Sequence, residues 1–191
     1  IHVIKDKKID VILSVQHRWI ISKNIIEEVN GYAFNTHFGK LPEYRGEHGH
    51  IHAILNGEKS VTTTIHFIDP KVDMGDIIAE AVIPINSDDT SWSLWHKAVS
   101  GAVKLNKILL DYIAMDEIIP HKKVIGKGRL YKRKSIEGLK EIVSLADFDE
   151  VDKKSRAFYY PPHEPAYFIL KNKKYYVSPK ALYHENVNGM N

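Results

Sequence analysis

Short runs of apolar and β-branched residues, separated by turn-forming positions, divide the first half of the chain into strands and helices. The continuous run IDVILSV is typical of a buried strand, and later runs rich in Val, Ile and Thr have the same character. We therefore expect strands at residues 9–15, 31–38, 61–68 and 76–85. Apolar residues at helical spacing predict helices at residues 22–30 and 48–57. This alternation favours right-handed βαβ crossovers in a parallel sheet, with the last two strands as neighbours.

The longest helical pattern of the chain follows these strands. Apolar residues recur at helical spacing through residues 88–115. Either Asp89 or Thr90 can cap the start of this helix, much as Ser22 can cap the helix at 22–30. The pattern therefore predicts a long amphipathic helix that covers one face of the sheet.

The remaining positions predict a smaller extension. Residues 121–134 are rich in lysine and arginine and contain no acidic residue, with two glycines that favour a loop or a ragged strand pair. We expect a further helix at 135–148 and a β-hairpin at 165–183. The chain thus divides into a domain at residues 1–120 and a C-terminal extension with a helix and a hairpin at residues 121–191.

The amino-acid composition excludes several classes of protein and of functional site. The 191 residues are 43% hydrophobic and 27% charged, which suffices for one domain of ordinary size. A net charge of +3 does not by itself indicate nucleic-acid binding. The absence of cysteine excludes disulfides, a thiolate nucleophile and cysteine-based metal sites. No apolar run approaches the roughly 18 residues of a membrane span, and we expect a soluble, cytoplasmic protein without a membrane contact.

The stretch FNTHFGKLPEYRGEHGH at residues 34–50 concentrates chemically active side chains. Asn35 and His37 share one face of a strand, at the carboxyl end where ligands bind in open α/β sheets. A histidine there can move protons near neutral pH, and an amide can stabilise a developing oxyanion. Asp73 lies in the turn KVDMGD before the next strand and can orient the imidazole. An Asn-x-His triplet also arises by chance, and an Asp in such a turn is often only a turn residue.

Taken together, these motifs point to a family. Asn35-Thr36-His37, Leu41-Pro42, Arg45-Gly46 and the turn VDMGD at 72–76 occur in an order that resembles the formyltransferases that use N10-formyltetrahydrofolate. The resemblance covers roughly residues 9–110 and implies a Rossmann-like α/β fold. By match, Asn35 would hold the formyl oxygen, His37 would handle the proton of the attacking amine, and Asp73 would raise the basicity of the histidine.

The resemblance also implies a site for the donor, N10-formyltetrahydrofolate, and no metal. The donor would be held by the loop after the first strand, largely through backbone groups, and by the turn that carries Asp73. The candidate cofactor-binding residues are Gln16, His17, Arg18, Trp19, Ile20 and Asp73. The family places a further βα portion ahead of residue 9, which this chain would lack, and commonly has serine where Gly39 stands.

The C-terminal segment at 155–177, SRAFYYPPHEPAYFILKNKKYYV, resembles the tail of bacterial sugar N-formyltransferases. This favours a nucleotide-linked amino-dideoxy sugar as acceptor, for O-antigen or another surface polysaccharide; we expect a dTDP-linked sugar, with a UDP-linked sugar left open. The candidate substrate-binding residues are Arg45, Arg156, Tyr159 and Tyr160, whose guanidinium and aromatic groups suit a diphosphate and a base. The two tyrosines can equally pack the hairpin against the domain. The aromatic residues at 158–176 suit a dimer interface, and we expect a homodimer.

Other interpretations stay open at this point. Within the family, the acceptor can instead be glycinamide ribonucleotide, methionyl-tRNA, or water in a formyltetrahydrofolate hydrolase. His48 and His52 have the i, i+4 spacing of a zinc-binding pair, although no further ligand stands in the expected place. The basic stretch at 121–134 is compatible with a nucleic-acid-binding module, but its single aromatic residue favours a solvated loop and no nucleic-acid partner.

Overall fold

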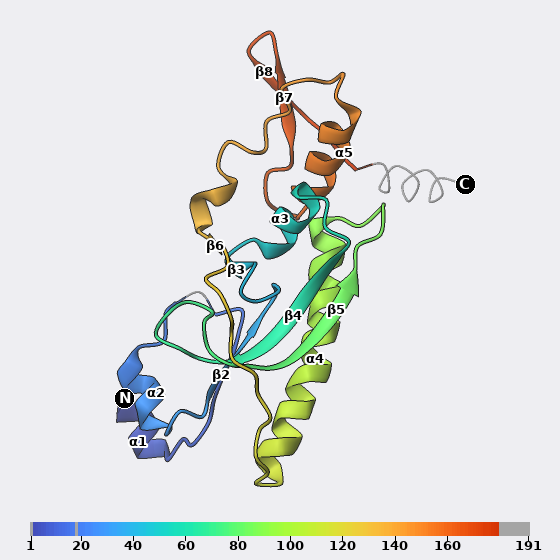
Figure 1. The fold of residues 1–191 in the computed structure, drawn as a ribbon. Helices are drawn as coiled ribbons and strands as arrows, with labels where there is room; N and C mark the ends of the chain where they lie inside the picture. The colour runs from blue at the N-terminus through green and yellow to red at the C-terminus, as the bar shows by residue number, and fades with distance from the viewer. Residues whose placement is uncertain (1, 18, 180–191) are drawn as a thin grey trace, which may run out of the picture.

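The computed structural model describes residues 2–17 and 19–179 of the protein (Figure 1). A central sheet has the strand order β1-β2-β4-β5. Its strands are β1 (Ile12–Val15), β2 (Ala33–His37), β4 (Ser60–Phe67) and β5 (Ile77–Pro84). Two small sheets pair β3 (Arg45–Gly46) with β6 (Leu130–Tyr131), and β7 (Tyr167–Leu170) with β8 (Lys173–Tyr176). The helices are α1 (His2–Lys7), α2 (Lys23–Glu28), α3 (Gly49–Leu55), α4 (Ser91–Ala114) and α5 (Phe148–Ala157), with a 3-10 turn η1 (Arg133–Ile136).

The central sheet is mixed. β1 and β2 are parallel and are connected through α2, which confirms the first predicted crossover. β2 and β4 are antiparallel, so the second predicted parallel crossover was wrong. The short helix α3 packs on α5 and does not run back along the sheet, and the chain therefore enters β4 from the end at which β2 stopped. β4 and β5 pair as neighbours, as predicted.

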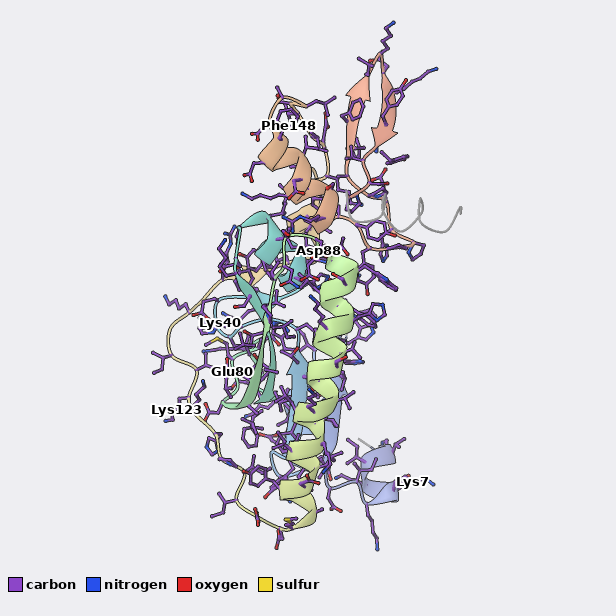
Figure 2. The ribbon with its side chains drawn as sticks, turned by 90° about the vertical axis from the view of Figure 1, so that its right-hand side faces the viewer. Lys7, Lys40, Glu80, Asp88, Lys123 and Phe148 are labelled. Atoms are coloured by element: carbon purple, nitrogen blue, oxygen red, sulfur yellow. The ribbon has the colours of Figure 1, made fainter. Side chains whose placement is uncertain are left out.

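The long helix α4 forms the other layer of the domain, packed against β4 and β5. Figure 2 shows it along one face of the sheet, with the loop of Lys123 on the opposite side. Thr90 is its N-cap and forms a capping box with Ser93. Two clusters of buried side chains form the core, and the one beside the C-terminal half of α4 consists of Phe34, Ile65, Leu105, Leu109 and Ile119.

The C-terminal part departs from one prediction. The expected helix at 135–148 was wrong, because the segment contains only η1 at its start and the first residue of α5 at its end. Gly138 has a φ of 77°, which ends the helical path. Beyond it, the Ile142 amide donates to the Tyr167 carbonyl, so this segment runs along β7. The predicted hairpin is confirmed as β7 and β8; positions 180–183 of that prediction lie outside the described residues.

The basic stretch at 121–134 forms a ragged, mostly irregular segment, as predicted. It touches β5 through a bridge at Lys122 and contributes β6, which pairs with β3. This pairing draws the chain across the carboxyl end of β2 and on toward η1 and the hairpin (Figure 1). In residues 2–17 and 19–179, every helix is too short or too polar to cross a bilayer.

Candidate active site

Successive side chains of strand β2 point to opposite faces of the sheet, and only one of these faces borders the cleft. Phe34 is fully buried against the α4 side, and the Thr36 hydroxyl hydrogen-bonds to the amide of Asn106 on that helix. Asn35 and His37 point to the other face and line a cleft of about 690 Å³. The two-residue spacing read from the sequence therefore places both side chains in one concave site.

Asp73 reaches the same cleft from the turn between β4 and β5. Its φ is 51°, an unusual value for a residue with a side chain, and such conformations concentrate at functional sites. The Gly46 amide donates to Asp73 Oδ2 at 2.7 Å, and His37 Nδ1 lies 3.7 Å from the same oxygen. The structure thus brings together Asn35, His37 and Asp73.

Two glycines permit this close packing. A Cβ at position 75 would overlap the Phe67 carbonyl oxygen, so the turn that carries Asp73 can approach β4 only with glycine there. A Cβ at position 39 would lie 2.5 Å from both His37 Nε2 and the Tyr44 carbonyl oxygen. Gly39 therefore leaves room for the hydrogen bond between these two groups.

The hydrogen bonds of His37 determine its tautomer. Nε2 lies 2.6 Å from the Tyr44 carbonyl oxygen, which can only accept, so Nε2 carries the proton and Nδ1 has the free electron pair. Burial lowers the pKa of His37 below its ordinary value of 6.5, more than Asp73 and the Tyr44 carbonyl raise it. The imidazole is accordingly neutral at pH 7, with Nδ1 able to accept a proton beside the Asp73 carboxylate.

The pKa of Asp73 responds in the opposite direction. Burial of the carboxyl group acts to raise its pKa, but His37, His66 and the Gly46 amide outweigh burial and lower the pKa to about 2. Asp73 is therefore ionised throughout the neutral range. It can stabilise the positive charge that His37 acquires when Nδ1 is protonated.

Sequence reasoning missed two neighbours of Asn35. Ser14 Oγ donates to Asn35 Oδ1 at 2.9 Å, and Asn35 Nδ2 lies 3.2 Å from His66 Nε2. His66 Nε2 is also 3.5 Å from Asp73 Oδ1. The side chains of Ser14 and His66 are buried, and the sequence pattern places them only within strands. The signal that finds them is the strand register, which aligns Ser14, Asn35 and His66 across β1, β2 and β4.

The predicted donor-binding residues lie along the same cleft. Gln16, His17, Trp19 and Ile20 line it, together with Val72 of the turn before Asp73. Trp19 and Ile20 are 78% and 73% exposed, so they offer uncovered apolar surface on which a flat ring system can lie. Arg18, the remaining predicted residue, lies outside the described residues.

The predicted acceptor-binding residues are placed differently from one another. Tyr160 lines the cleft, whereas Arg45, Arg156 and Tyr159 are absent from its described lining. Arg45 donates to the carbonyl oxygens of Val72 and Lys127 and so fastens the turn of Asp73. The guanidinium of Arg156 binds Asp152 and the Asp89 carbonyl oxygen at the start of α4.

Further cationic and aromatic residues, which are not among the expected acceptor-binding residues, line the cleft around Tyr160. We call this part of the cleft the cationic wall. Lys132 and Arg133 of the basic stretch line the cleft together with Lys140, and Trp95 lies there beside Tyr160. Arg133 pairs with Glu47 at 3.2 Å and Lys140 with Glu164 at 3.7 Å. Lys132 has no ion-pair partner among the described residues. This wall suits a ligand with both phosphate groups and a planar base.

Two of the three neighbouring histidines, His48 and His52, have hydrogen-bond partners within the protein. His52 Nε2 lies 2.8 Å from Ser135 Oγ and its ring stacks on Tyr131, while His48 Nε2 lies 3.2 Å from the Arg133 carbonyl oxygen. Burial lowers the pKa of His50 to about 4. Within residues 2–17 and 19–179, no three potential metal ligands come together.

Comparison with known proteins places this geometry in a family. The sequence profile described as formyl transferase matches residues 1–105, more than half of the chain. The chain belongs to the formyl transferase family. It is therefore an enzyme of formyl transfer, and the Rossmann-like α/β fold with a C-terminal hairpin is confirmed.

Individual relatives of this formyltransferase include sugar N-formyltransferases. The GDP-perosamine N-formyltransferase of Brucella melitensis is 27% identical over 95% of this chain and 69% of its own length. A 4-N formyltransferase from Francisella tularensis has a TM-score of 0.80 at 25% identity, covering 90% of this chain and 70% of the other. An N-formyltransferase from Helicobacter canadensis, solved in complex with folinic acid and dTDP-3-aminofucose, has a TM-score of 0.71 at 25% identity, covering 85% and 59%.

The short distance between the Asp73 carboxylate and His37 leads to a pH prediction. The Asp73 carboxylate raises the pKa of His37, so Asp73→Asn lowers that pKa further. We expect formyl transfer to require the neutral imidazole, so that its rate falls at low pH as His37 becomes protonated. We expect this acidic limb of kcat/KM to move to lower pH in the variant, with a loss of about 10²–10⁴-fold at the optimum. A pH–rate profile measures both effects.

Asp76→Asn is the matched control for this prediction. Asp76 lies in the same turn, but its carboxylate lies near His121, and it does not line the described cleft. The acidic limb of kcat/KM for the Asp76→Asn variant should coincide with that of the unaltered enzyme. An acidic limb that stays in place in Asp73→Asn, or moves to higher pH, contradicts the assigned interaction.

Proposed function

We propose that this formyltransferase moves the formyl group of N10-formyltetrahydrofolate onto the amine of a nucleotide-linked amino-dideoxy sugar. The observation that carries the proposal is the composition of the single cleft around Asn35, His37 and Asp73. Exposed apolar residues after β1 line one part, and cationic and aromatic residues of the C-terminal half line another. Its volume of about 690 Å³ allows two ligands to meet at these three side chains.

The donor supplies a formyl carbon that is attacked by the amine of the acceptor. A free N–H of Asn35 stabilises the negative charge that develops on the formyl oxygen. His37 Nδ1 takes the proton that the attacking amine must lose, and Asp73 stabilises the resulting imidazolium. The carbon–nitrogen bond to N10 of the donor then breaks, and the same proton is delivered to the departing nitrogen. Atoms and charges balance, and His37 returns to its neutral form.

The acceptor class is supported by the wall that contains Lys132, Arg133 and Tyr160. Ammonium and guanidinium groups suit a diphosphate, and aromatic faces suit a base. The relatives named above include one for a GDP-linked sugar and one in complex with a dTDP-linked sugar. A dTDP-linked sugar stays our prediction, and a GDP-linked sugar is the alternative.

The remaining expectations are proposals of the same kind. The role in O-antigen or surface polysaccharide synthesis, the cytoplasmic location, the division of the chain at residue 120 and the absence of a nucleic-acid partner stay predictions.

We also propose a homodimer formed through β8, whose residues are exposed along its whole length. If two copies of β8 pair antiparallel about their centres, Lys173 faces Tyr176 and Lys174 faces Tyr175, an arrangement that favours cation–π contacts.

The cationic wall yields a prediction about substrate affinity. Lys132→Ala should raise the KM for the nucleotide-linked sugar about tenfold, because a charge-assisted contact with a phosphate is lost. The KM for the folate donor should not change. Lys134→Ala, two residues along in η1 and outside the described cleft lining, is the control and should leave both constants unchanged. An equal rise of both KM values in Lys132→Ala would contradict the assignment of this wall to the acceptor.

An acceptor panel tests the proposed function. The enzyme is incubated with N10-formyltetrahydrofolate and with dTDP-, GDP- and UDP-linked amino sugars, and products are identified by mass spectrometry. We expect one sugar to gain the mass of a formyl group. Transfer to glycinamide ribonucleotide or methionyl-tRNA, with no sugar modified, would overturn the proposed acceptor class.

A further inference from the structure

A row of three side chains crosses the sheet on the face of the cleft. Ser14 in β1 stands opposite Asn35 in β2, and Asn35 stands opposite His66 in β4. Residues that are directly opposite on neighbouring strands project on the same face. Ser14 and His66 are 8% and 2% exposed, and all three residues line the cleft. The sheet register therefore places a buried partner on each side of the proposed oxyanion donor.

The hydrogen bonds along this row have a defined direction. His66 Nδ1 lies 2.7 Å from the Phe67 carbonyl oxygen, which can only accept, so Nδ1 carries a proton. With Nδ1 protonated, the neutral imidazole accepts at Nε2, and the donor nearest to Nε2 is Asn35 Nδ2 at 3.2 Å; Asp73 Oδ1 lies farther from Nε2, at 3.5 Å. The other end of the amide, Asn35 Oδ1, accepts from Ser14 Oγ at 2.9 Å. The row thus runs from a serine donor to a backbone acceptor.

We propose that Ser14 and His66 are positioning residues that fix the orientation of the Asn35 amide during formyl transfer. One N–H of Asn35 Nδ2 is engaged by His66, which leaves the second N–H available to the cleft. If the amide turned by half a rotation, Oδ1 would face the electron pair of His66 Nε2, and both N–H groups would move to the side of Ser14. The electron pair of His66 Nε2 disfavours this orientation, and the hydrogen bond from Ser14 holds Oδ1 on the opposite side of the amide.

A purely structural role for Ser14 makes different predictions. If Ser14 only ties β1 to β2, its removal lowers stability and leaves the turnover of the folded enzyme unchanged. If Ser14 acts through Asn35, its removal lowers kcat, because Oδ1 loses the donor that holds it and the amide leaves its productive position more often. The KM values for donor and acceptor do not change, since Ser14 is not assigned to either ligand. The effect should also vanish once Asn35 is gone.

The experiment compares kcat and both KM values of Ser14→Ala, Ser14→Thr and Thr63→Val. Thr63 is the control because its buried hydroxyl donates to the Ala98 carbonyl oxygen at 3.2 Å, on the α4 side of the sheet. We expect Ser14→Ala to lose about tenfold in kcat at unchanged KM, and Ser14→Thr, which keeps the hydroxyl, to recover the rate. Thr63→Val should lose stability but not kcat. A rate in Ser14→Thr as low as in Ser14→Ala would overturn the proposal.

A double variant makes the test stricter. In an Asn35→Ala background, Ser14→Ala should cause no further loss of kcat, because there is no amide left to orient. The same tenfold loss in both backgrounds would show that Ser14 acts independently of Asn35, and would overturn the proposal. The inference rests on the proposed formyl transfer. If the unaltered enzyme transfers formyl but Ser14→Ala is fully active, only this inference fails; if the unaltered enzyme transfers none, the proposed function fails.

Discussion

His37→Asn should reduce formyl transfer by at least about 10²–10⁴-fold, the usual contribution of a positioned general base. Asparagine is smaller but keeps a polar atom near the position of Nδ1, and the hydrogen bond from Nε2 to the Tyr44 carbonyl oxygen is lost. Asparagine cannot accept a proton near neutral pH, and the attacking amine then has no group to receive its proton. The environment of His37 supports this role, since burial lowers its pKa and its Nδ1 faces the ionised Asp73. Single-turnover measurements at saturating donor and acceptor test the chemical step directly.

The control for this variant is His121→Asn. His121 packs on Phe67 and lies outside the described cleft lining, so its replacement should leave the rate within about twofold. Binding of both substrates to His37→Asn, measured by calorimetry, should remain close to that of the unaltered enzyme. Near-normal turnover in His37→Asn would refute the assignment of this residue as the base.

Asn35→Ala should lower kcat by about 10²–10³-fold, equivalent to about 2.7–4 kcal/mol of barrier, as for the loss of one oxyanion donor. In the proposed reaction, the N–H of Asn35 that is not bound to His66 stabilises charge that develops only in the transition state. The KM values should therefore change little, because the neutral formyl group of the bound donor needs this contact less. Steady-state kinetics with either substrate varied at saturating levels of the other separates the two effects.

Asn106→Ala provides a matched comparison on the opposite face of the same strand. Asn106 hydrogen-bonds to Thr36 and lies on α4, away from the cleft. Its loss should reduce the free energy of unfolding by about 1 kcal/mol and leave kcat unchanged. If Asn35→Ala instead raised KM with no change in kcat, Asn35 would be a binding residue and not a transition-state donor.

The features that the sequence predicted well are those that local patterns determine. The two-residue spacing of Asn35 and His37 requires only that β2 be a strand, because alternation then places both on one face. The turn of Asp73 follows from its glycine and from the short distance between two strands. The long helix α4 follows from apolar spacing and from the Thr90 cap.

Other features depend on how distant segments meet, and no local pattern contains that information. His66 becomes a neighbour of Asn35 only because β4 runs antiparallel to β2 in one register. Arg45 and Arg156 have the right chemistry for a phosphate, but backbone carbonyls and Asp152 take up their donors. Lys132 reaches the cleft because β6 pairs with β3, so a stretch that resembled a solvated loop forms part of the wall.

The central claim is that Asn35, His37 and Asp73 transfer a formyl group to an amine. The most direct test uses N10-formyltetrahydrofolate labelled with ¹³C in the formyl carbon, with a nucleotide-linked amino sugar, and compares the enzyme with His37→Asn by mass spectrometry. We predict that the label appears in an amide of the sugar and that this product is almost absent with the variant. Label released as formate with the sugar unmodified, or equal label in the sugar with both proteins, would contradict the account.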